Sequence, residues 1–164
     1  MALMDNKCCI ITGGAGSLGL ASAKLLLSEG ARVLLVDRSR EDLDKAAEGL
    51  EEDKVLTAAA DVTDTDQTKA YIGKAIDAWG QLDVLFSNAG VSGTNAPITD
   101  YPEDIFDNVI SVNVKGSFLA CKYAIPHMTS GGSIIVTSSI MGVQARPNSV
   151  GYITPKHALV GMVR

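Results

Sequence analysis

Apolar runs rich in β-branched residues alternate along this chain with segments of helical period, and this alternation constrains the fold more than any other feature. The apolar runs cover residues 7–12, 32–37, 54–60, 82–88 and 133–138. Strands that alternate with helices form a parallel sheet covered by helices. The runs are almost continuously hydrophobic, which predicts strands that are buried on both faces. We therefore expect an α/β fold built on a doubly wound, Rossmann-like parallel sheet.

Length and composition predict one domain over residues 1–164. Of the 164 residues, 46% are hydrophobic and 20% are charged, as in globular α/β proteins, and we find no repeat or linker. The net charge is -5 without a Lys/Arg cluster, so nucleic acid is not an expected partner. The chain shows neither a signal segment nor an apolar run of membrane-spanning length, so we expect a cytoplasmic protein without a membrane partner. The three cysteines form no CxxC motif and are predicted to be small core residues.

A long helix is predicted over residues 102–128, opened by a proline and two acidic residues. Its apolar residues cover more of its circumference than one sheet can bury. An exposed patch of that breadth is unfavourable in a soluble monomer, so we expect a homo-oligomer, either a dimer or a tetramer. Other helix ends are also specified: Gly30 and Gly80 follow periodic segments, and Asp64 or Thr65 can cap the helix after the third strand.

The first predicted strand leads into TGGAGSLG at residues 12–19, directly before the first predicted helix. Glycines permit a tight turn, and the helix N-terminus presents free N–H groups to a pyrophosphate. The strand–turn–helix setting favours dinucleotide binding over a turn that serves packing alone. Asp37 ends the next strand, where a carboxylate accepts hydrogen bonds from the ribose hydroxyls of NAD. The predicted contacts in the turn are Gly13, Gly14, Gly16, Ser17, Leu18 and Gly19.

With these motifs, the chain resembles the short-chain dehydrogenase/reductase family from its first strand to its C-terminus. SNAG at 87–90 and DVTD at 61–64 resemble the segments that the family places beside the cofactor. The resemblance implies further cofactor contacts from Asp61, Val62, Asn88, Ala89 and Gly90. It also implies a catalytic set of Asn113, Ser139, Tyr152 and Lys156, of which the last two are expected to contact the cofactor as well.

Each of these residues also has an ordinary structural interpretation. Asn113 can be a polar residue inside a helix, Ser139 a turn former and Asp61 a helix cap. Tyr152 and Lys156, at positions i and i+4, are neighbours on any helix. Their agreement with the family in order and spacing favours the functional interpretation. His127 and His157 are expected to complement a helix dipole and to face solvent, and we find no cluster of metal ligands.

The resemblance implies an NAD-dependent oxidoreductase of the short, single-domain branch, which transfers hydride between nicotinamide and a small-molecule secondary alcohol or ketone. The glycine spacing differs from that branch, because Ser17 stands where its middle glycine is usual. An extended-branch nucleotide-sugar epimerase or dehydratase is therefore one alternative, although SNAG, Asn113 and Ser139 resemble the short branch. A non-catalytic NAD-binding sensor is a second alternative, and the Ser/Tyr/Lys set argues against it.

Two expectations concern the C-terminal part of the chain. Pro155 stands where a small residue is usual before the lysine, and a proline disfavours helical angles at the preceding Thr154. The last helix is therefore expected to begin at Pro155. By resemblance, a sixth strand, a substrate-binding loop and a seventh strand would follow, so we expect a fold truncated after the fifth strand, inside the helix that carries Tyr152 and Lys156.

Overall fold

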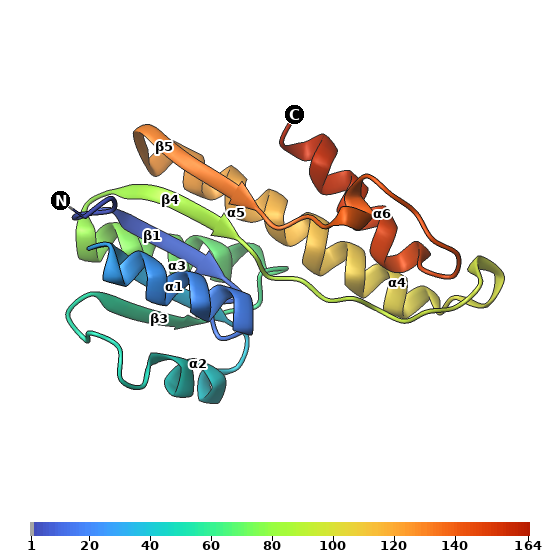
Figure 1. Cartoon of the computed structure of the whole chain (residues 1–164), viewed down its shortest axis with the longest axis horizontal. Coiled ribbons are helices and arrows are strands. Elements are labelled where there is room, and N and C mark those ends of the chain that lie inside the picture. Colours follow the sequence, from blue (N-terminus) through green and yellow to red (C-terminus); the bar gives the residue numbers. More distant parts are fainter. Residues whose placement is uncertain (1) are drawn as a thin grey trace.

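The computed structural model describes residues 2–164, and within them five parallel strands form one sheet in the order β3-β2-β1-β4-β5 (Figure 1). This order reverses direction at β1 and β4, as in a doubly wound sheet, so the predicted fold class is confirmed. The strands are β1 (Cys8–Thr12), β2 (Arg32–Asp37), β3 (Val55–Ala59), β4 (Leu82–Ser87) and β5 (Met128–Val136).

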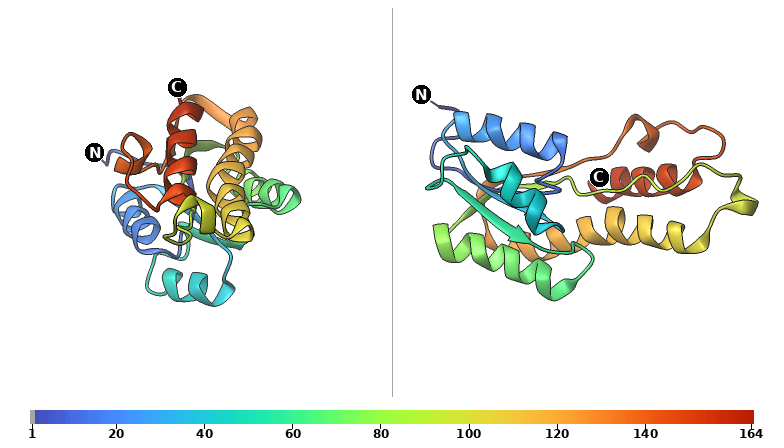
Figure 2. Two further views of the ribbon diagram at one scale, coloured as in Figure 1. Left: turned by 90° about the vertical axis from the view of Figure 1, so that its right-hand side faces the viewer. Right: turned by 90° about the horizontal axis from the view of Figure 1, so that it is seen from below.

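Helices cover both faces of the sheet. On one face lie α1 (Ser17–Ser28) and α2 (Arg40–Ala47), and on the other lie α3 (Thr65–Trp79) and α5 (Gly116–Ala124) (Figure 2). Beyond the carboxyl ends of the strands, α4 (Glu103–Ile110) packs against α6 (Val150–Met162). In residues 2–164, no helix has the length and apolar composition needed to cross a membrane.

Each face of the sheet has its own buried cluster. Leu34, Leu85 and Tyr71 belong to the cluster under α3 and α5, whereas Val33 and Leu35 belong to the cluster under α1 and α2. Neighbouring residues of β2 thus point to opposite faces, which explains why this strand is hydrophobic throughout. Cys8 and Cys9 are fully buried in β1, as predicted, and burial raises the pKa of the Cys9 thiol to about 12.

The prediction of burial on both faces holds for the three central strands and is wrong for the two edge strands. Residues of β3 are mostly half-buried, and Ile134 and Ile135 of β5 are 37% and 49% exposed. An edge strand has one strand neighbour instead of two, and no helix in the described part of the chain covers the front of β5 in Figure 1. Position in the sheet, which a hydrophobic run does not encode, causes the difference.

Strand boundaries differ most at β5, which begins at Met128 instead of residue 133. Met128 pairs with Leu82, and the register shifts before Ser133 pairs with Val84. Residues between these two pairs bulge out of the ladder, and Gly131 there has a φ of 83°. The predicted run therefore identified only the regular part of the strand. The third strand is shorter than predicted, covering 55–59 instead of 54–60.

Two predicted helix ends are confirmed in detail. The Asp64 carboxylate caps α3 by accepting hydrogen bonds from the amides of Asp66 and Gln67. Gly80 ends the same helix with a left-handed φ of 73°, a conformation that glycine adopts without strain.

The long helix predicted over 102–128 is helical for most of that length but not α-helical throughout. A π-helical turn at Ser111–Lys115 (η2) separates α4 from α5, and a 3-10 turn at Ile125–His127 (η3) ends the second helix. Two further 3-10 turns lie at Ile98–Asp100 (η1) and Ile140–Gly142 (η4). A π-turn shifts the hydrogen-bond register by one residue and is frequent at functional sites. Asn113 lies at its centre.

The prediction that the last helix begins at Pro155 is wrong. Helix α6 begins at Val150, and Thr154 and Pro155 both lie inside it. A proline inside a helix lacks an N–H donor and costs about 3 kcal/mol, but it does not forbid the helix. Pro155 is buried, and Lys156 beside it is held by two hydrogen bonds: its side chain donates to the Thr137 carbonyl, and its own carbonyl accepts from the Ser138 hydroxyl. Tertiary contacts of this kind offset the local cost.

Candidate functional site

A glycine-rich turn connects β1 to α1 at the carboxyl edge of the sheet. Gly13 has a φ of 66°, and a Cβ atom there would lie 3.0 Å from the Asn88 amide nitrogen. A Cβ atom on Gly19 would overlap the Gly13 carbonyl oxygen, and one on Gly14 would lie 3.0 Å from the Cα atom of Leu35. Gly16 caps α1 without a side-chain hydrogen bond, so the first amide groups of this helix remain available to an anion.

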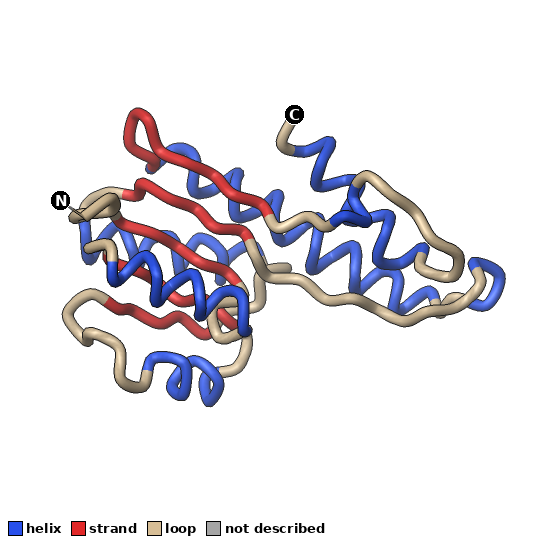
Figure 3. Tube along the Cα trace, in the orientation of Figure 1, coloured by secondary structure: helices blue, strands red, loops and turns tan. Residues whose placement is uncertain are grey.

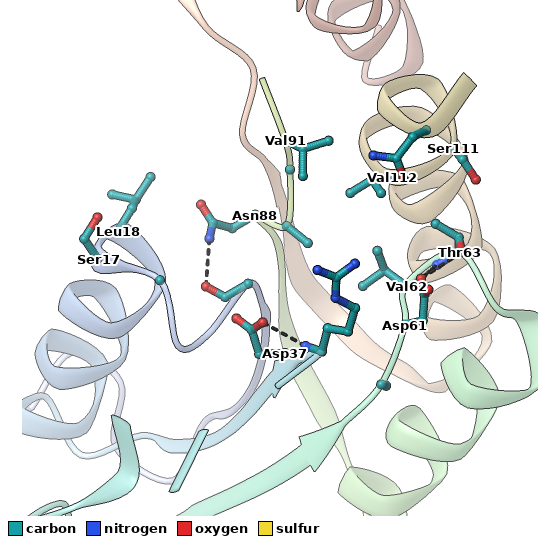
Figure 4. A pocket seen from close by; sticks show the side chains of 17 residues that line it. Ser17, Leu18, Asp37, Asp61, Val62, Thr63, Asn88, Val91, Ser111 and Val112 are labelled. Carbon is teal, nitrogen blue, oxygen red and sulfur yellow. Dashed lines mark hydrogen bonds between the residues drawn. The ribbon is translucent and has the colours of Figure 1, made fainter. Parts of the chain in front are cut away.

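The turn forms one side of a pocket of about 410 Å³ (Figure 4). The opposite wall comes from the segment after β3 and from the end of α4 with the π-turn. Ten of the predicted cofactor contacts line this pocket: Gly13, Gly16, Ser17, Leu18, Asp37, Asp61, Val62, Asn88, Ala89 and Gly90. Gly14 and Gly19 instead pack behind the turn. Among the described residues, the pocket lining does not include Tyr152 or Lys156.

Seven residues that line the pocket were not predicted as cofactor contacts: Arg38, Ala60, Thr63, Val91, Asn108, Ser111 and Val112. Three of these follow directly on predicted residues, so position along the chain offered a signal for Arg38, Thr63 and Val91. Asn108, Ser111 and Val112 come from the helix that holds Asn113. Helical period could have suggested Asn108, but the π-turn changes which side chains of this helix reach the pocket.

Two carboxylates face the pocket from the ends of β2 and β3. The Asp37 side chain accepts hydrogen bonds from the Ala15 amide at 3.1 Å and from the Arg38 amide at 2.8 Å. Asp61 accepts from both the amide and the hydroxyl of Thr63, each at 2.8 Å. These two hydrogen bonds lower the pKa of Asp61, and the nearby positive charge of Arg38 acts in the same direction. Asp61 caps no helix.

Asn88 joins the ends of three strands. Its side-chain amide donates to the carbonyl oxygens of Thr12 at 3.2 Å and Gly13 at 3.3 Å, while its oxygen accepts from the Thr137 hydroxyl at 3.1 Å. The Thr12 hydroxyl oxygen in turn accepts from the amides of Asn88 and Ala89. These contacts fix the glycine-rich turn relative to the segment that leaves β5.

Asn113 is only 1% exposed, and its side chain pairs with the backbone of Val91. Its oxygen accepts the Val91 amide at 2.8 Å, and its nitrogen donates to the Val91 carbonyl at 2.9 Å. The Asn113 carbonyl accepts the Ser117 hydroxyl at 2.9 Å, and Ser87 donates to Ser117. Within residues 2–164, no hydrogen bond connects Asn113 to Ser139, Tyr152 or Lys156. The Asn113 side chain is thus joined to the pocket wall at Val91.

Ser139 caps η4, and η4 packs against α6, the helix that carries Tyr152 and Lys156. Tyr152 and Lys156 share one helix face, with the ammonium nitrogen 5.6 Å from the centre of the tyrosine ring. Lys156 is 5% exposed and donates to the Thr137 carbonyl at 2.8 Å. Burial lowers the pKa of Lys156. The Ser139 oxygen accepts from the Met141 amide at 3.2 Å, which leaves its hydroxyl proton free for another acceptor.

The doubly wound sheet, with its glycine-rich turn and pocket at the carboxyl edge, defines a Rossmann-like α/β domain. Residues 7–164 match the family described as short chain dehydrogenase, and the chain belongs to this family.

Individual relatives agree with this membership. The chain is 38% identical to levodione reductase of Leifsonia aquatica, with 97% of this chain and 62% of that protein covered. It is 37% identical to 3-oxoacyl-[acyl-carrier-protein] reductase FabG of Thermotoga maritima, covering 98% of this chain and 67% of that protein. The crystal structure of carveol dehydrogenase from Mycobacterium avium in complex with NAD superimposes with a TM-score of 0.94 at 30% identity, covering 100% of this chain and 65% of that one. The chain thus spans roughly three fifths to two thirds of the length of such relatives.

Proposed function

We propose that the protein containing this chain is an NAD-dependent oxidoreductase that transfers hydride between nicotinamide and a secondary alcohol or ketone. The observation that carries the proposal is the arrangement of Ser139, Tyr152 and Lys156 at the carboxyl edge of the sheet, on the same side as the pocket. A lysine ammonium group beside a tyrosine ring, on a helix that packs against a turn capped by a serine, is suited to proton transfer at an oxygen atom.

The residues of the pocket fit a dinucleotide. Gly13, Gly14 and Gly19 leave no room for a side chain because each packs closely against neighbouring protein atoms, which keeps this turn tight. The uncapped N-terminus of α1 suits a pyrophosphate, and Asp37 suits a ribose diol. We assign Gly13, Gly16, Ser17 and Leu18 to the phosphates and the adjoining ribose. Asp61 and Val62 are assigned to the adenine side, and Asn88, Ala89 and Gly90 to the middle of the cofactor.

In the oxidation direction, Tyr152 as phenolate accepts the hydroxyl proton of the alcohol, while Ser139 donates a hydrogen bond to the same oxygen. When bound, the nicotinamide supplies the hydride acceptor. A phenol with an ordinary pKa of about 10 needs roughly 4 kcal/mol of preferential stabilisation of its anion to ionise near pH 7. The charge of Lys156 supplies part of that stabilisation. We assign Asn113 to holding the pocket wall through Val91.

We further propose a cytoplasmic homo-oligomer that associates through the long helix. Phe118 is 50% exposed and Ile125 is 55% exposed on α5 and η3, away from the sheet. Lys122 lies over the Phe118 ring, with its nitrogen 5.7 Å from the ring centre. Exposed apolar side chains on one helix surface are the kind of patch that a second copy covers.

Tyr152→Phe tests the proposed function in the protein containing this chain. The variant keeps the ring beside Lys156 but removes the acid/base, so we expect kcat to fall by about 100-fold or more while the dissociation constant for NAD changes less than about threefold. Tyr123→Phe on α5 is the matched control, because it makes the same chemical change outside the site. Retained turnover in Tyr152→Phe would remove the tyrosine from the chemistry and favour a non-catalytic sensor.

A further inference from the structure

A loop leaves β4 at residue 88 and runs beside α4 and α6 before the chain enters α4 (tan in Figure 3). At its near end, Val91 lines the pocket and binds Asn113. At its far end, Tyr101 precedes α4 and packs edge-to-face on Phe106, with ring centres 6.3 Å apart and planes at 87°. The loop therefore joins the pocket wall to the helix pair.

The hydroxyl group of Tyr101 lies between two glycines. It accepts a hydrogen bond from the Thr94 amide at 3.2 Å. A Cβ atom on Gly93, whose φ is 70°, would overlap this hydroxyl oxygen. A Cβ atom on Gly151 would overlap the same oxygen and lie 3.0 Å from the ring carbon Cε1. We call Gly93, Tyr101 and Gly151 the Tyr101 clamp.

Backbone and side-chain hydrogen bonds hold the loop to α6 beside the clamp. The Ala96 amide donates to the Asn148 carbonyl at 3.0 Å, and the Ser149 hydroxyl donates to the Asn95 side-chain oxygen at 3.2 Å. Ser149 is 2% exposed and directly precedes the first residue of α6. The start of this helix is thus fixed by the loop and not by α6 alone.

The glycine at position 151 is explained by close approach. Gly151 is the second residue of α6, and glycine in a helix is less favourable than alanine by up to about 1 kcal/mol, so its presence there needs a reason. Gly161 in the same helix has nothing within 4 Å of an added Cβ atom, whereas Gly151 is in contact with the Tyr101 ring. Tyr101 therefore sets how closely the first turn of α6 approaches the loop, and the next residue after Gly151 is Tyr152.

We propose that Tyr101 is a positioning residue: through its contact with Gly151 it places Tyr152 for proton transfer, and through the loop it couples that placement to the pocket wall at Val91. This inference rests on the proposed function, in which Tyr152 is the acid/base. Tyr101 itself does not line the pocket described above. A displacement of about 1 Å at a catalytic group can cost about 100-fold in rate, so a contact this close to Tyr152 has a measurable effect.

The test is a double-mutant cycle on the protein containing this chain. Gly151→Ala is expected to lower kcat by about 100-fold, because the new methyl group pushes Tyr101 and the first turn of α6 apart. In the Tyr101→Ala background, where the ring is absent, the same change is expected to lower kcat by less than about threefold. Gly161→Ala is the matched control and is expected to leave kcat within about twofold.

Two readouts separate positioning from a general loss of structure. Activity is expressed per molecule of folded protein, and the NAD dissociation constant is expected to stay within about threefold. The pH profile of kcat is expected to shift in Gly151→Ala, because a displaced Tyr152 changes its position relative to the Lys156 charge. If Gly151→Ala does not fold, Tyr101→Phe takes its place: it keeps the ring, removes the acceptor for the Thr94 amide, and is expected to lower kcat by about threefold to tenfold.

The outcomes distinguish this inference from the proposed function. If Tyr152→Phe is inactive but Gly151→Ala behaves like Gly161→Ala, the clamp is overturned and the proposed function stands. An equal loss from Gly151→Ala in both backgrounds also overturns it, as does an unchanged pH profile, or unchanged kcat in Tyr101→Phe where that variant is used. If Tyr152→Phe retains turnover, both fail together.

Discussion

Replacing Asp37 by asparagine changes the charge at the end of β2 with little change in shape. Asp37 lines the pocket and accepts hydrogen bonds from the amides of Ala15 and Arg38. Asparagine keeps one of the two oxygen acceptors, so it loses one of these hydrogen bonds where alanine would lose both. The variant therefore isolates the effect of the negative charge on the choice between NAD and NADP.

The size of the effect follows from the position of the carboxylate. In the proposed binding mode, the 2′-phosphate of NADP would approach Asp37 to about 4 Å, where two like unit charges repel by about 4 kcal/mol at an effective dielectric constant of 20 and by about 1 kcal/mol in bulk water. Asp37 is half-buried, so we expect about 2 kcal/mol, which corresponds to roughly 30-fold. The unmodified protein should prefer NAD by about 30-fold in kcat/KM, and Asp37→Asn should reduce the preference below about fivefold.

The assay measures kcat/KM with NAD and with NADP for the protein containing this chain and for each variant. Asp77→Asn, at an exposed position on α3, is the control for an equal change in net charge. Arg38 also lines the pocket, and once the carboxylate is neutral its guanidinium is free to pair with a phosphate. Equal use of both cofactors by the unmodified protein, or an unchanged ratio in Asp37→Asn, would refute the placement of Asp37 against the ribose.

Two further predictions concern stability and do not depend on the proposed function. Asp83 is 4% exposed, and although burial raises its pKa, hydrogen bonds from Cys8, Lys7, Thr129 and Gln81 outweigh burial and hold the pKa below its ordinary value. Asp83→Asn should therefore lower the free energy of unfolding by about 2–3 kcal/mol in urea titrations at pH 7. This difference between the two proteins should be lost as the pH falls from about 4 through the lower pKa of the folded state. An equal difference at pH 7 and pH 2 would contradict the prediction. Among residues 2–164, the buried Tyr71 hydroxyl has no hydrogen-bond partner, so Tyr71→Phe should raise the free energy of unfolding by up to about 1 kcal/mol. A loss of more than about 1 kcal/mol would reveal a partner.

The sequence predicted the central part of the fold because burial and local geometry point the same way there. The runs that became β1, β2 and β4 are apolar on both faces, and the chain buries them on both faces. At β5 the hydrophobic pattern and the strand pairing do not coincide. Met128 pairs with Leu82, but the glycines that follow leave the ladder before pairing resumes at Ser133. A bulge is specified by tertiary pairing, so a hydrophobic pattern finds only the regular strand beyond it.

Within the candidate site, the sequence predicted which residues line the pocket better than how the other site residues are held. The position of Asn113 was readable from a motif, but the π-turn around it was not, because a one-residue change of register hardly alters the apolar period of a helix. At Pro155 the sequence predicted a local feature, a helix start, that the structure does not have. A local rule for the residue before proline was applied to Thr154, and the tertiary contacts of α6 overrode it.

Those contacts explain how a helix with an interior proline keeps two catalytic candidates in register. Lys156 is held twice by the segment that leaves β5: its ammonium group donates to the Thr137 carbonyl, and its own carbonyl accepts the Ser138 hydroxyl, each at 2.8 Å. A Cβ atom on Gly142 would overlap the Ser138 hydroxyl oxygen and lie 2.8 Å from the Lys156 carbonyl oxygen. The turn η4 therefore packs directly against the hydrogen bond between Ser138 and Lys156.

Five residues before Lys156, Gly151 packs against the Tyr101 side chain. Helix α6 is therefore fixed on both sides of Tyr152, by the strand exit at Lys156 and by the loop at Gly151, with Pro155 between the two points. Pro155 has no N–H group, so the helix lacks one hydrogen bond at a place where contacts outside the helix already define the position of the helix. The loss therefore lowers local stability but does not change the geometry of the Tyr152–Lys156 pair. In the proposed function, the motif supplies the two reactive groups, while Gly142 and Gly151, which carry no side chain, allow the close contacts that place them.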